Sequence, residues 1–201
     1  MRITLFDYGA GNLHSLAKAL RGDDREVRLE ADAQAAADTD VLVLPGVGAF
    51  AHAAAALCAG RATMRNAVRA GLPCLGICLG MQLMFDGSDE GEGDGLGVFG
   101  GRVGRIRANR LPQIGWNTID EPRDGLFAAA RLDMAYYANS FVCRPNDDDD
   151  VIAWSSHGGD RFPAAVRLGN TVGVQFHPEK SSVPGIAFVH EFLSSVSHSS
   201  L

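Results

Sequence analysis

Gly76-Ile77-Cys78-Leu79-Gly80 decides the fold of this chain, because it sets a cysteine between two glycines where two kinds of structure meet. The apolar residues 74–77 before it predict a short strand, and residues 81–85 after it predict the start of a helix. A nucleophile flanked by small residues at a strand–turn–helix junction is typical of a nucleophile elbow, in which the next backbone N–H faces an oxyanion. The pattern predicts that Cys78 is the nucleophile of an enzyme that acts on an amide.

A second motif, His177-Pro178-Glu179, supplies the groups that such a cysteine needs. By itself, a Gly-x-Cys-x-Gly segment is about equally compatible with a nucleophilic cysteine and with a buried core cysteine. Cys74, in the apolar strand, is predicted to be a core residue. A thiol needs a neighbouring base for its activation, and a carboxylate orients the imidazole that provides it. Pro178 restrains the backbone between them and biases His177 toward an extended conformation. We therefore predict a triad of Cys78, His177 and Glu179.

Length and composition favour a single intracellular domain. A chain of 201 residues can bury a substantial core without disulfides. The net charge of −6 and the absence of a basic cluster argue against nucleic acid binding. The cysteines show no Cys-x-x-Cys pair and no zinc-ligand spacing, so we expect reduced thiols, a cytoplasmic location, no metal and no cofactor. The chain enters a strand at once, so no signal peptide is expected, and no apolar run reaches the roughly 20 residues of a membrane span.

Short apolar runs alternate with helical segments in the first part of the chain. Strands are predicted at residues 3–6, 27–29, 41–44 and 74–77, and helices at 13–20, 51–59 and 63–70. This order predicts an α/β fold with a mostly parallel central sheet and helices on both faces.

The second part of the chain has a different character. A glycine- and acid-rich stretch, residues 87–104, with loops around 96–99, is followed by shorter predicted strands, several of them antiparallel, at 114–117, 134–139, 151–155, 165–167 and 171–175. A final helix at 186–193 completes one domain, residues 3–193, and residues 194–201 are predicted to form a disordered polar tail.

Two polar segments carry no predicted site of their own. Gly9-Ala10-Gly11-Asn12 lacks the third glycine of a dinucleotide fingerprint and the lysine of a P-loop, so it is predicted to be an ordinary loop. The four adjacent aspartates at 147–150 cannot easily converge on one ion, so they are predicted to be a solvated loop tip.

The motifs around Cys78 and His177 resemble the signatures of class I, or triad, glutamine amidotransferases, in residues 76–82 and 173–181. Further stretches are similar to one branch, the glutaminase subunit of imidazole glycerol phosphate synthase: residues 7–13, Pro45-Gly46-Val47-Gly48-Ala49-Phe50 and Gln113-Ile114-Gly115-Trp116-Asn117. Other branches usually carry Pro-Gly-Gly where this chain has Pro45-Gly46-Val47-Gly48. The resemblance extends from residue 3 to about residue 192.

The resemblance implies a glutaminase that hydrolyses glutamine to glutamate and ammonia. It places Gly46-Val47-Gly48 beside the nucleophile, so that the N–H groups of Val47 and Leu79 would form the oxyanion hole. The glycines that flank Val47 let its peptide unit rotate at modest cost, so this segment is a candidate switch.

The resemblance also implies which residues contact the substrate, namely Gly48, Gln82, Ser140 and Phe141. Gln82 lies one helical turn after Cys78 and can therefore face the same pocket. The chain departs from the usual pattern at three positions: Asn139 stands where histidine is usual, and Phe141 and His157 stand where tyrosine is usual. Backbone contacts rather than side-chain contacts are therefore expected there.

Because the chain has no motif or length for a second reaction, the resemblance implies a separate cyclase subunit. That partner is a (β/α)8 barrel, which forms a heterodimer with the glutaminase, receives its ammonia, and makes imidazole glycerol phosphate and AICAR in histidine biosynthesis. The docking face would include Asn12, Trp116 and Lys180, with Trp116 at the mouth of the ammonia path. Taken alone, a tryptophan is more often a core residue, and Lys180 would be an ordinary surface lysine.

Three alternatives stay open from the sequence. The nearest is the glutaminase subunit of another class I amidotransferase, of the anthranilate or aminodeoxychorismate synthase type, which ammonia transfer to different partners would distinguish. The second is a cysteine peptidase or related thiol hydrolase, which His177-Pro178-Glu179-Lys180 supports little. The third is a non-catalytic regulatory subunit, against which the complete triad argues.

Overall fold

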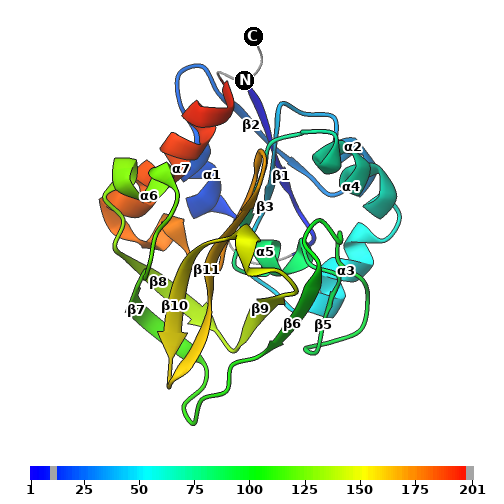
Figure 1. Ribbon diagram of the computed structural model, residues 1–201. Coiled ribbons are helices and arrows are strands. Elements are labelled where there is room, and N and C mark those ends of the chain that lie inside the picture. Colours follow the sequence, from blue (N-terminus) through cyan, green and yellow to red (C-terminus); the bar gives the residue numbers. More distant parts are fainter. Residues whose placement is uncertain (10–12, 198–201) are drawn as a thin grey trace.

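A seven-stranded sheet forms the middle layer of the computed structural model, which describes residues 1–9 and 13–197 (Figure 1). The strand order is β10-β11-β12-β4-β3-β1-β2. The strands are β1 (Arg2–Phe6), β2 (Glu26–Glu30), β3 (Val41–Leu44), β4 (Cys74–Ile77), β10 (Val151–His157), β11 (Asp160–Leu168) and β12 (Thr171–Val174). From β2 to β12 all neighbours are parallel, and β11 and β10 are antiparallel additions at one edge. The predicted α/β fold with a mostly parallel sheet is confirmed.

Helices cover both faces of this sheet (Figure 1). On one side lie α1 (His14–Leu20), α6 (Gly125–Ala130) and α7 (Ser182–Ser197), and on the other lie α2 (Ala33–Ala36), α3 (Phe50–Leu57), α4 (Arg61–Arg69) and α5 (Leu79–Leu83). In the described residues, no helix is long and apolar enough to cross a membrane.

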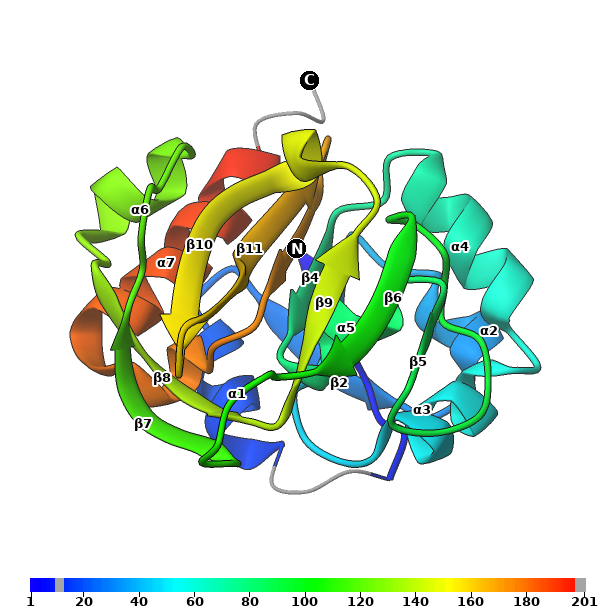
Figure 2. The ribbon, with the colours of Figure 1, turned by 60° about the horizontal axis from the view of Figure 1, so that its bottom comes forward.

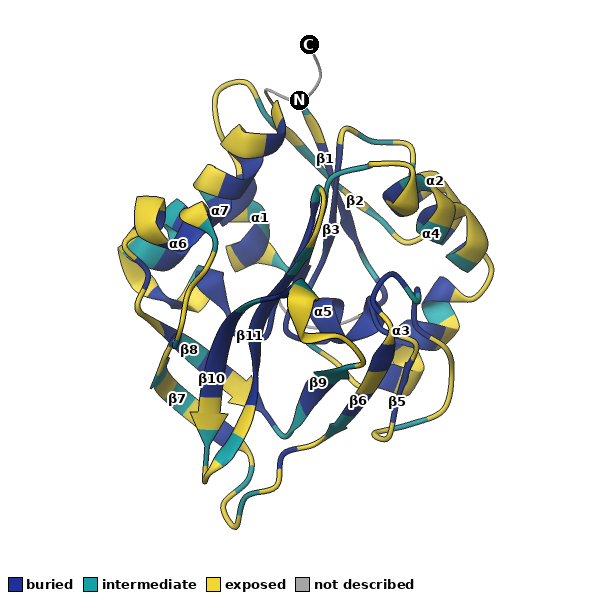
Figure 3. Ribbon diagram, in the orientation of Figure 1, coloured by how far each residue is buried: buried dark blue, intermediate teal, exposed yellow. Residues whose placement is uncertain are grey.

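The central strands are buried on both faces, as strands between two helical layers must be (Figure 3). In β3, Val41 and Val43 belong to the core under α1, α6 and α7, whereas Leu42 and Leu44 belong to the core under α2 to α5. The continuous apolar run Val41–Leu44 therefore fills two cores at once, because successive side chains point to opposite faces.

Two smaller sheets lie beside the main one (Figure 2). One contains β5 (Gly87–Ser88), β6 (Gly101–Arg105) and β9 (Phe141–Pro145), and the other is the antiparallel pair β7 (Gln113–Thr118) and β8 (Met134–Asn139). The turn between β8 and β9 thus connects the two small sheets at Ser140.

Several elements have no counterpart in the sequence prediction: α2, α6, β5, β6 and β9. The sequence of β6, Gly-Arg-Val-Gly-Arg, lacks the apolar alternation that marks a strand. It pairs with β9 so closely that a Cβ atom at Gly101 would lie 2.3 Å from the carbonyl oxygen of Arg144. Tertiary pairing therefore makes this strand, and its glycine permits the pairing.

The predicted disordered tail at 194–201 is wrong for residues 194–197, which belong to α7. Val196 is buried against the same core as Phe192 and Leu193, so the apolar face of the helix continues past the predicted end at 193. Residues 198–201 lie outside the described residues.

Candidate active site

The predicted elbow lies between β4 and α5, with Cys78 at its tip. Cys78 has φ 49° and ψ −104°, a left-handed backbone conformation that a residue with a Cβ adopts only where its surroundings impose it. Its N–H donates to the carbonyl of Val174 on β12 at 2.7 Å, and its own carbonyl accepts the N–H of Gln82 at 3.1 Å. The predicted nucleophile is thus held between the sheet and the first turn of the helix.

The two glycines of the elbow are required by close contact. A Cβ at Gly80 would lie 2.0 Å from the carbonyl oxygen of Leu44, and one at Gly76 would lie 2.8 Å from the carbonyl oxygen of Gly80. The positive φ falls on Cys78 itself, so the glycines serve to let α5 pack directly on β3 and β4.

His177 and Glu179 follow the end of β12. His177 has φ −102° and ψ 95°, the extended conformation predicted for a residue before proline, and Pro178 opens the short turn Pro178–Lys180. The Nδ1 atom of His177 lies 2.9 Å from Oε1 of Glu179. The backbone N–H of His177 donates to the Tyr136 carbonyl at 2.8 Å, and the Ser181 hydroxyl donates to the His177 carbonyl at 2.7 Å. Both the ring and its backbone are therefore fixed.

The electrostatics of the site favour a charged imidazole beside the sulfur. Burial alone would lower the pKa of His177, but its hydrogen bonds to Cys78 and Glu179 outweigh burial and raise that pKa to about 10. Since Nδ1 is engaged by Glu179, Nε2 is the nitrogen left to face Cys78. An imidazolium at this position stabilises a thiolate by charge pairing.

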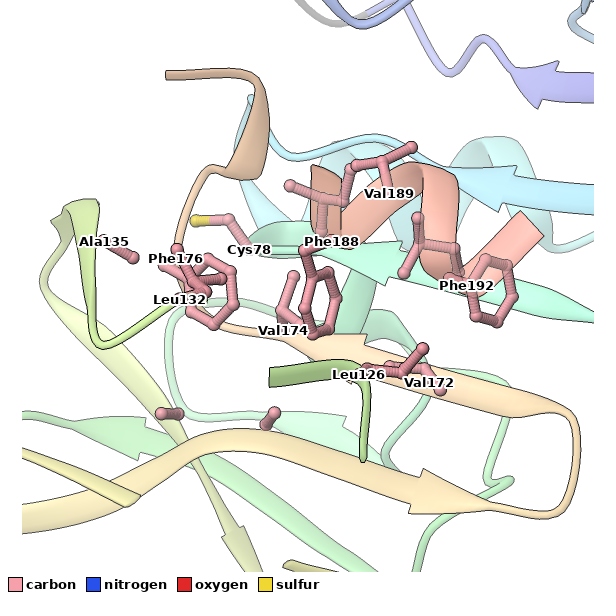
Figure 4. Packing of buried hydrophobic residues seen from close by; sticks show 14 of the residues in the cluster. Cys78, Leu126, Leu132, Ala135, Val172, Val174, Phe176, Phe188, Val189 and Phe192 are labelled. Atoms are coloured by element: carbon pink, nitrogen blue, oxygen red, sulfur yellow. The ribbon is translucent and has the colours of Figure 1, made fainter. Parts of the chain in front are cut away.

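The other cysteines have different surroundings. Burial raises the pKa of both Cys74 and Cys143 above the ordinary thiol range, so both remain neutral, and Cys58 is exposed on the surface. The expectation that Cys74 is a core residue is confirmed by its complete burial. Cys78 lies at the border of the apolar cluster that includes Phe176 and Phe188 (Figure 4).

A pocket of about 310 Å³ opens over the cysteine and the histidine. The predicted residues that line it are Val47, Gly48, Cys78, Leu79, Gln82, Ser140, Phe141, His177 and Lys180. Gly46 and Asn139 also line it, as do three residues that the sequence did not single out: Glu90, Pro112 and Ala138. Glu179 reaches the site through its bond to His177.

The segment Gly46-Val47-Gly48, predicted to supply an oxyanion donor, packs against the same corner. Leu79 is the first residue of α5, where backbone N–H groups have no partner within the helix. A Cβ at Gly46 would lie 2.9 Å from the Ile77 carbonyl oxygen and 3.1 Å from Cε1 of His177. Gly46 therefore lies directly against His177, and Val47 lines the same pocket as Cys78 and His177.

Comparison with known proteins decides the family. The model of the family "Glutamine amidotransferase class-I" matches residues 4–195. The chain belongs to this family. The imidazole glycerol phosphate synthase subunit HisH of Cutibacterium acnes is 38% identical, over 98% of each chain. The HisH subunit of Saccharolobus solfataricus is 42% identical, over 94% of this chain and 96% of the relative, and that of Symbiobacterium thermophilum 43%, over 92% and 90%.

These relatives place the amidotransferase in the branch that its sequence motifs predicted, the glutaminase subunits of imidazole glycerol phosphate synthase. Solved structures agree on the fold alone. A crystal structure of a glutamine amidotransferase superposes with a TM-score of 0.74 at 19% identity, over 97% of this chain and 98% of the other. The structure of PurLQS from Thermotoga maritima gives 0.71 at 20% identity, with the same coverage.

The side-chain amide nitrogen of Gln82 in this amidotransferase is hydrogen-bonded within the protein. Its Nε2 donates to the Phe141 carbonyl at 3.0 Å and lies 3.2 Å from Oε1 of Gln175. Gln175 in turn places its Nε2 3.5 Å from Sγ of Cys78. Sequence reasoning missed Gln175, although it precedes His177 by two residues at a strand end, a spacing that places two side chains on the same side.

Two of the departures from the family pattern have clear contacts. The Asn139 amide nitrogen donates to the Phe141 carbonyl at 3.0 Å, so this side chain braces the backbone of the pocket wall. The His157 ring contacts the Arg110 carbonyl at 2.9 Å in the β10–β11 hairpin. Glu90, which the sequence did not single out, accepts the N–H of Phe50 at 3.2 Å.

Two of the residues predicted for the docking face, Trp116 and Lys180, lie on or beside the β7–β8 pair. Trp116 is 53% exposed on the outer face of the β7–β8 pair, next to the exposed Ile114 and Met134, and is not a core residue. The Lys180 ammonium lies 5.9 Å from the centre of the Tyr136 ring on that pair. Asn12 lies outside the described residues.

Proposed function

We propose that this chain is the glutaminase subunit of an imidazole glycerol phosphate synthase and that Cys78, His177 and Glu179 perform its chemistry. The observation that carries the assignment is the strained Cys78 in contact with His177, whose other ring nitrogen pairs with Glu179. A nucleophile and a base at the floor of one pocket, with a carboxylate that orients the base, are the parts that cysteine acyl transfer requires.

The Cys78 thiolate attacks the side-chain amide carbon of glutamine, and the amide oxygen becomes an oxyanion. The N–H groups of Leu79 and Val47 stabilise this oxyanion, and removal of one such donor costs about a hundred- to a thousandfold in rate. His177 gives its proton to the departing amine, so ammonia leaves and a γ-glutamyl thioester forms on Sγ. Water then attacks the thioester while His177 takes up a proton, which releases glutamate and regenerates the thiolate.

The pocket lining supports a glutamine-sized substrate with charged ends. The Glu90 carboxylate suits the α-ammonium group, and the backbone of Gly48, Ser140 and Phe141 offers N–H groups to the α-carboxylate. Since the Gln82 amide nitrogen already contacts two acceptors, Gln82 offers its carbonyl oxygen to the substrate.

Ammonia that escaped into water would be protonated and lose its nucleophilicity, so a synthase gains from passing it directly to a cyclase. The partner is a (β/α)8-barrel cyclase, bound as a heterodimer in the cytoplasm, which uses the ammonia to make imidazole glycerol phosphate and AICAR. The exposed side chains of Ile114, Trp116 and Met134, with Lys180 beside them, form an apolar face with a basic rim that suits such docking.

The test is a steady-state glutaminase assay of the isolated chain, of its complex with the cyclase subunit, and of that complex with the cyclase ligand. We expect low turnover alone and strong activation by the loaded partner, because the Val47 peptide can rotate away from the oxyanion. Val47→Pro deletes the proposed donor and should flatten the activation while the complex still forms. Equal turnover in all three states would refute the switch. Ammonia transfer to an anthranilate synthase partner instead of the cyclase would favour the alternative branch.

A further inference from the structure

We propose that Gln175 is a positioning residue that holds Sγ of Cys78 and stabilises its anionic form, an inference that rests on the proposed function. Gln175 is fully buried directly after β12, and its Nε2 lies 3.5 Å from Sγ. A buried amide is retained in a core only where its polar atoms have partners. Here one partner is the nucleophile.

The hydrogen bonds fix which end of the Gln175 amide faces the sulfur. The Phe141 backbone carbonyl can only accept, so the Gln82 atom 3.0 Å from it must be the amide nitrogen. That nitrogen also lies 3.2 Å from Gln175, which must therefore present its carbonyl oxygen. The Nε2 of Gln175 is then the atom left for Cys78. A backbone carbonyl in the pocket wall thus orients an N–H toward the nucleophile.

This donor acts where water has little access. Cys78 is only 6% exposed, so an anionic sulfur there is stabilised mainly by protein groups. Hydrogen bonds to charged groups are roughly twice as strong as neutral ones. The thiolate exists before attack and again when the thioester breaks, and Gln175 can donate to it in both states without giving up a proton.

Other titratable groups surround the sulfur in the described part of the chain. Burial raises the pKa of Tyr8 and of Cys143 well above their ordinary values, so both stay neutral near pH 7. His177 supplies the positive charge next to Sγ, and Glu90 and Lys180 face the pocket above it. Gln175 adds a directed donor to this set without adding charge, so its removal changes the thiolate and leaves the charges in place.

The test replaces Gln175 by apolar residues of similar size, Gln175→Met and Gln175→Leu, in the full chain with its cyclase partner. We expect kcat for glutamine hydrolysis to fall about 10- to 100-fold. We also expect the pH midpoint of Cys78 alkylation by iodoacetamide, followed by peptide mapping, to rise by about one unit. The alkylation profile is the readout that a merely structural role would not move. Gln113→Met is the matched control, since it removes a buried amide on β7 that has no hydrogen bond to the sulfur among the described residues.

A measurement on the unmodified protein decides the matter if the apolar variants do not fold. In protein labelled with ¹⁵N-glutamine, the Gln175 side-chain amide signal should shift as Cys78 titrates and stay constant in Cys78→Ala, while the Gln113 signal moves in neither. The proposal would be overturned by a Gln175 amide signal that does not shift as Cys78 titrates. It would also be overturned by folded Gln175 variants whose kcat is within twofold of the native value and whose alkylation midpoint is unchanged. Failure of the proposed function looks different: the native complex would not hydrolyse glutamine, whatever the alkylation profiles show.

Discussion

The floor and the outer wall of the pocket over Cys78 and His177 are built in different ways. The floor consists of the ends of β3, β4 and β12 and the start of α5, whose backbones lie in direct contact. A Cβ at Gly80 in α5, for example, would lie 2.0 Å from the carbonyl oxygen of Leu44 at the end of β3. The wall around the β8–β9 turn is held by side-chain amides that reach a backbone carbonyl, such as Asn139 on Phe141. A floor of this kind tolerates no added atom, whereas a wall of this kind accepts any side chain that supplies the donor. Two of the departures from the usual family pattern, Asn139 and Phe141, lie in this wall.

The largest expected effect comes from the centre of the floor. Cys78→Ala removes the covalent route, so glutamine hydrolysis should fall by about four orders of magnitude or more. Cyclisation driven by added ammonium salt should persist in the complex, because that reaction needs ammonia alone. The measurement compares glutamine-dependent and ammonia-dependent turnover of one preparation.

Cys74→Ala is the matched control for this loss, since Cys74 begins the strand that leads to Cys78 and is fully buried. It should cost about 1 kcal/mol or more of stability through the small cavity and leave kcat near that of the native chain. Glutamine hydrolysis by Cys78→Ala above a trace would contradict the assignment of the nucleophile.

A second test asks whether the floor is as intolerant as its contacts indicate. In Gly80→Ala the new methyl group would collide with the Leu44 backbone, which cannot move without disturbing the sheet. We expect a loss of about 3 kcal/mol or more in the free energy of unfolding, measured by urea denaturation. Gly125→Ala is the control, because a Cβ there meets nothing within 4 Å in the first turn of α6. Its expected change lies within about 1 kcal/mol and is stabilising in sign. Equal effects at both glycines would contradict the tight packing of the floor.

The same distinction explains what the sequence could predict. The floor is encoded locally: residues 74–77 form a strand by their apolar character, and a Gly-x-Cys-x-Gly turn must follow. His177-Pro178-Glu179 is similarly self-contained, because two residues and a proline fix the geometry of the pair. Fold class and the placement of the proposed triad follow from such short segments.

The wall was harder to predict because long-range pairing defines it. Strand β6 has no periodic pattern and exists through its partner β9. Glu90 enters the pocket from a glycine-rich segment whose path no local signal gives. The two-residue spacing of Gln175 and His177 indicates that their side chains lie on the same side of the chain. The contact of Gln175 with Cys78, however, depends on Gln82 and Phe141, which lie far from it in the sequence.

A smaller effect should appear in the pH dependence of stability. The pKa of His177 is raised from its ordinary 6.5 to about 10, so the folded state binds this proton more tightly than the unfolded state. Its contribution is complete below about pH 6.5 and is lost as the pH rises toward 10. Glu179→Gln removes one of the two groups that raise the pKa, so its stability should depend less on pH in this window. Urea denaturation at pH 6.5, 8 and 9.5 gives the free energy of unfolding of the native chain and of Glu179→Gln. The difference between these two free energies should shrink by about 1 kcal/mol or more as the pH rises from 6.5 to 9.5. Parallel curves would contradict the pairing of His177 with Glu179.

The smallest effect on the isolated chain is expected at the outermost part of the wall. Trp116→Ala removes an exposed ring from the β7–β8 pair, so the free energy of unfolding should change by no more than about 0.5 kcal/mol, and basal glutamine hydrolysis should stay as it is. Affinity for the cyclase should nevertheless fall about tenfold or more, because aromatic anchors dominate binding at interfaces. Leu168→Ala is the control: Leu168 is similarly exposed, but it ends β11, away from this pair. Titration calorimetry of each variant with the cyclase separates the cases. Equal losses of affinity at both positions would show that general surface apolarity drives association, and an unchanged affinity in Trp116→Ala would move the docking face to another part of the molecule.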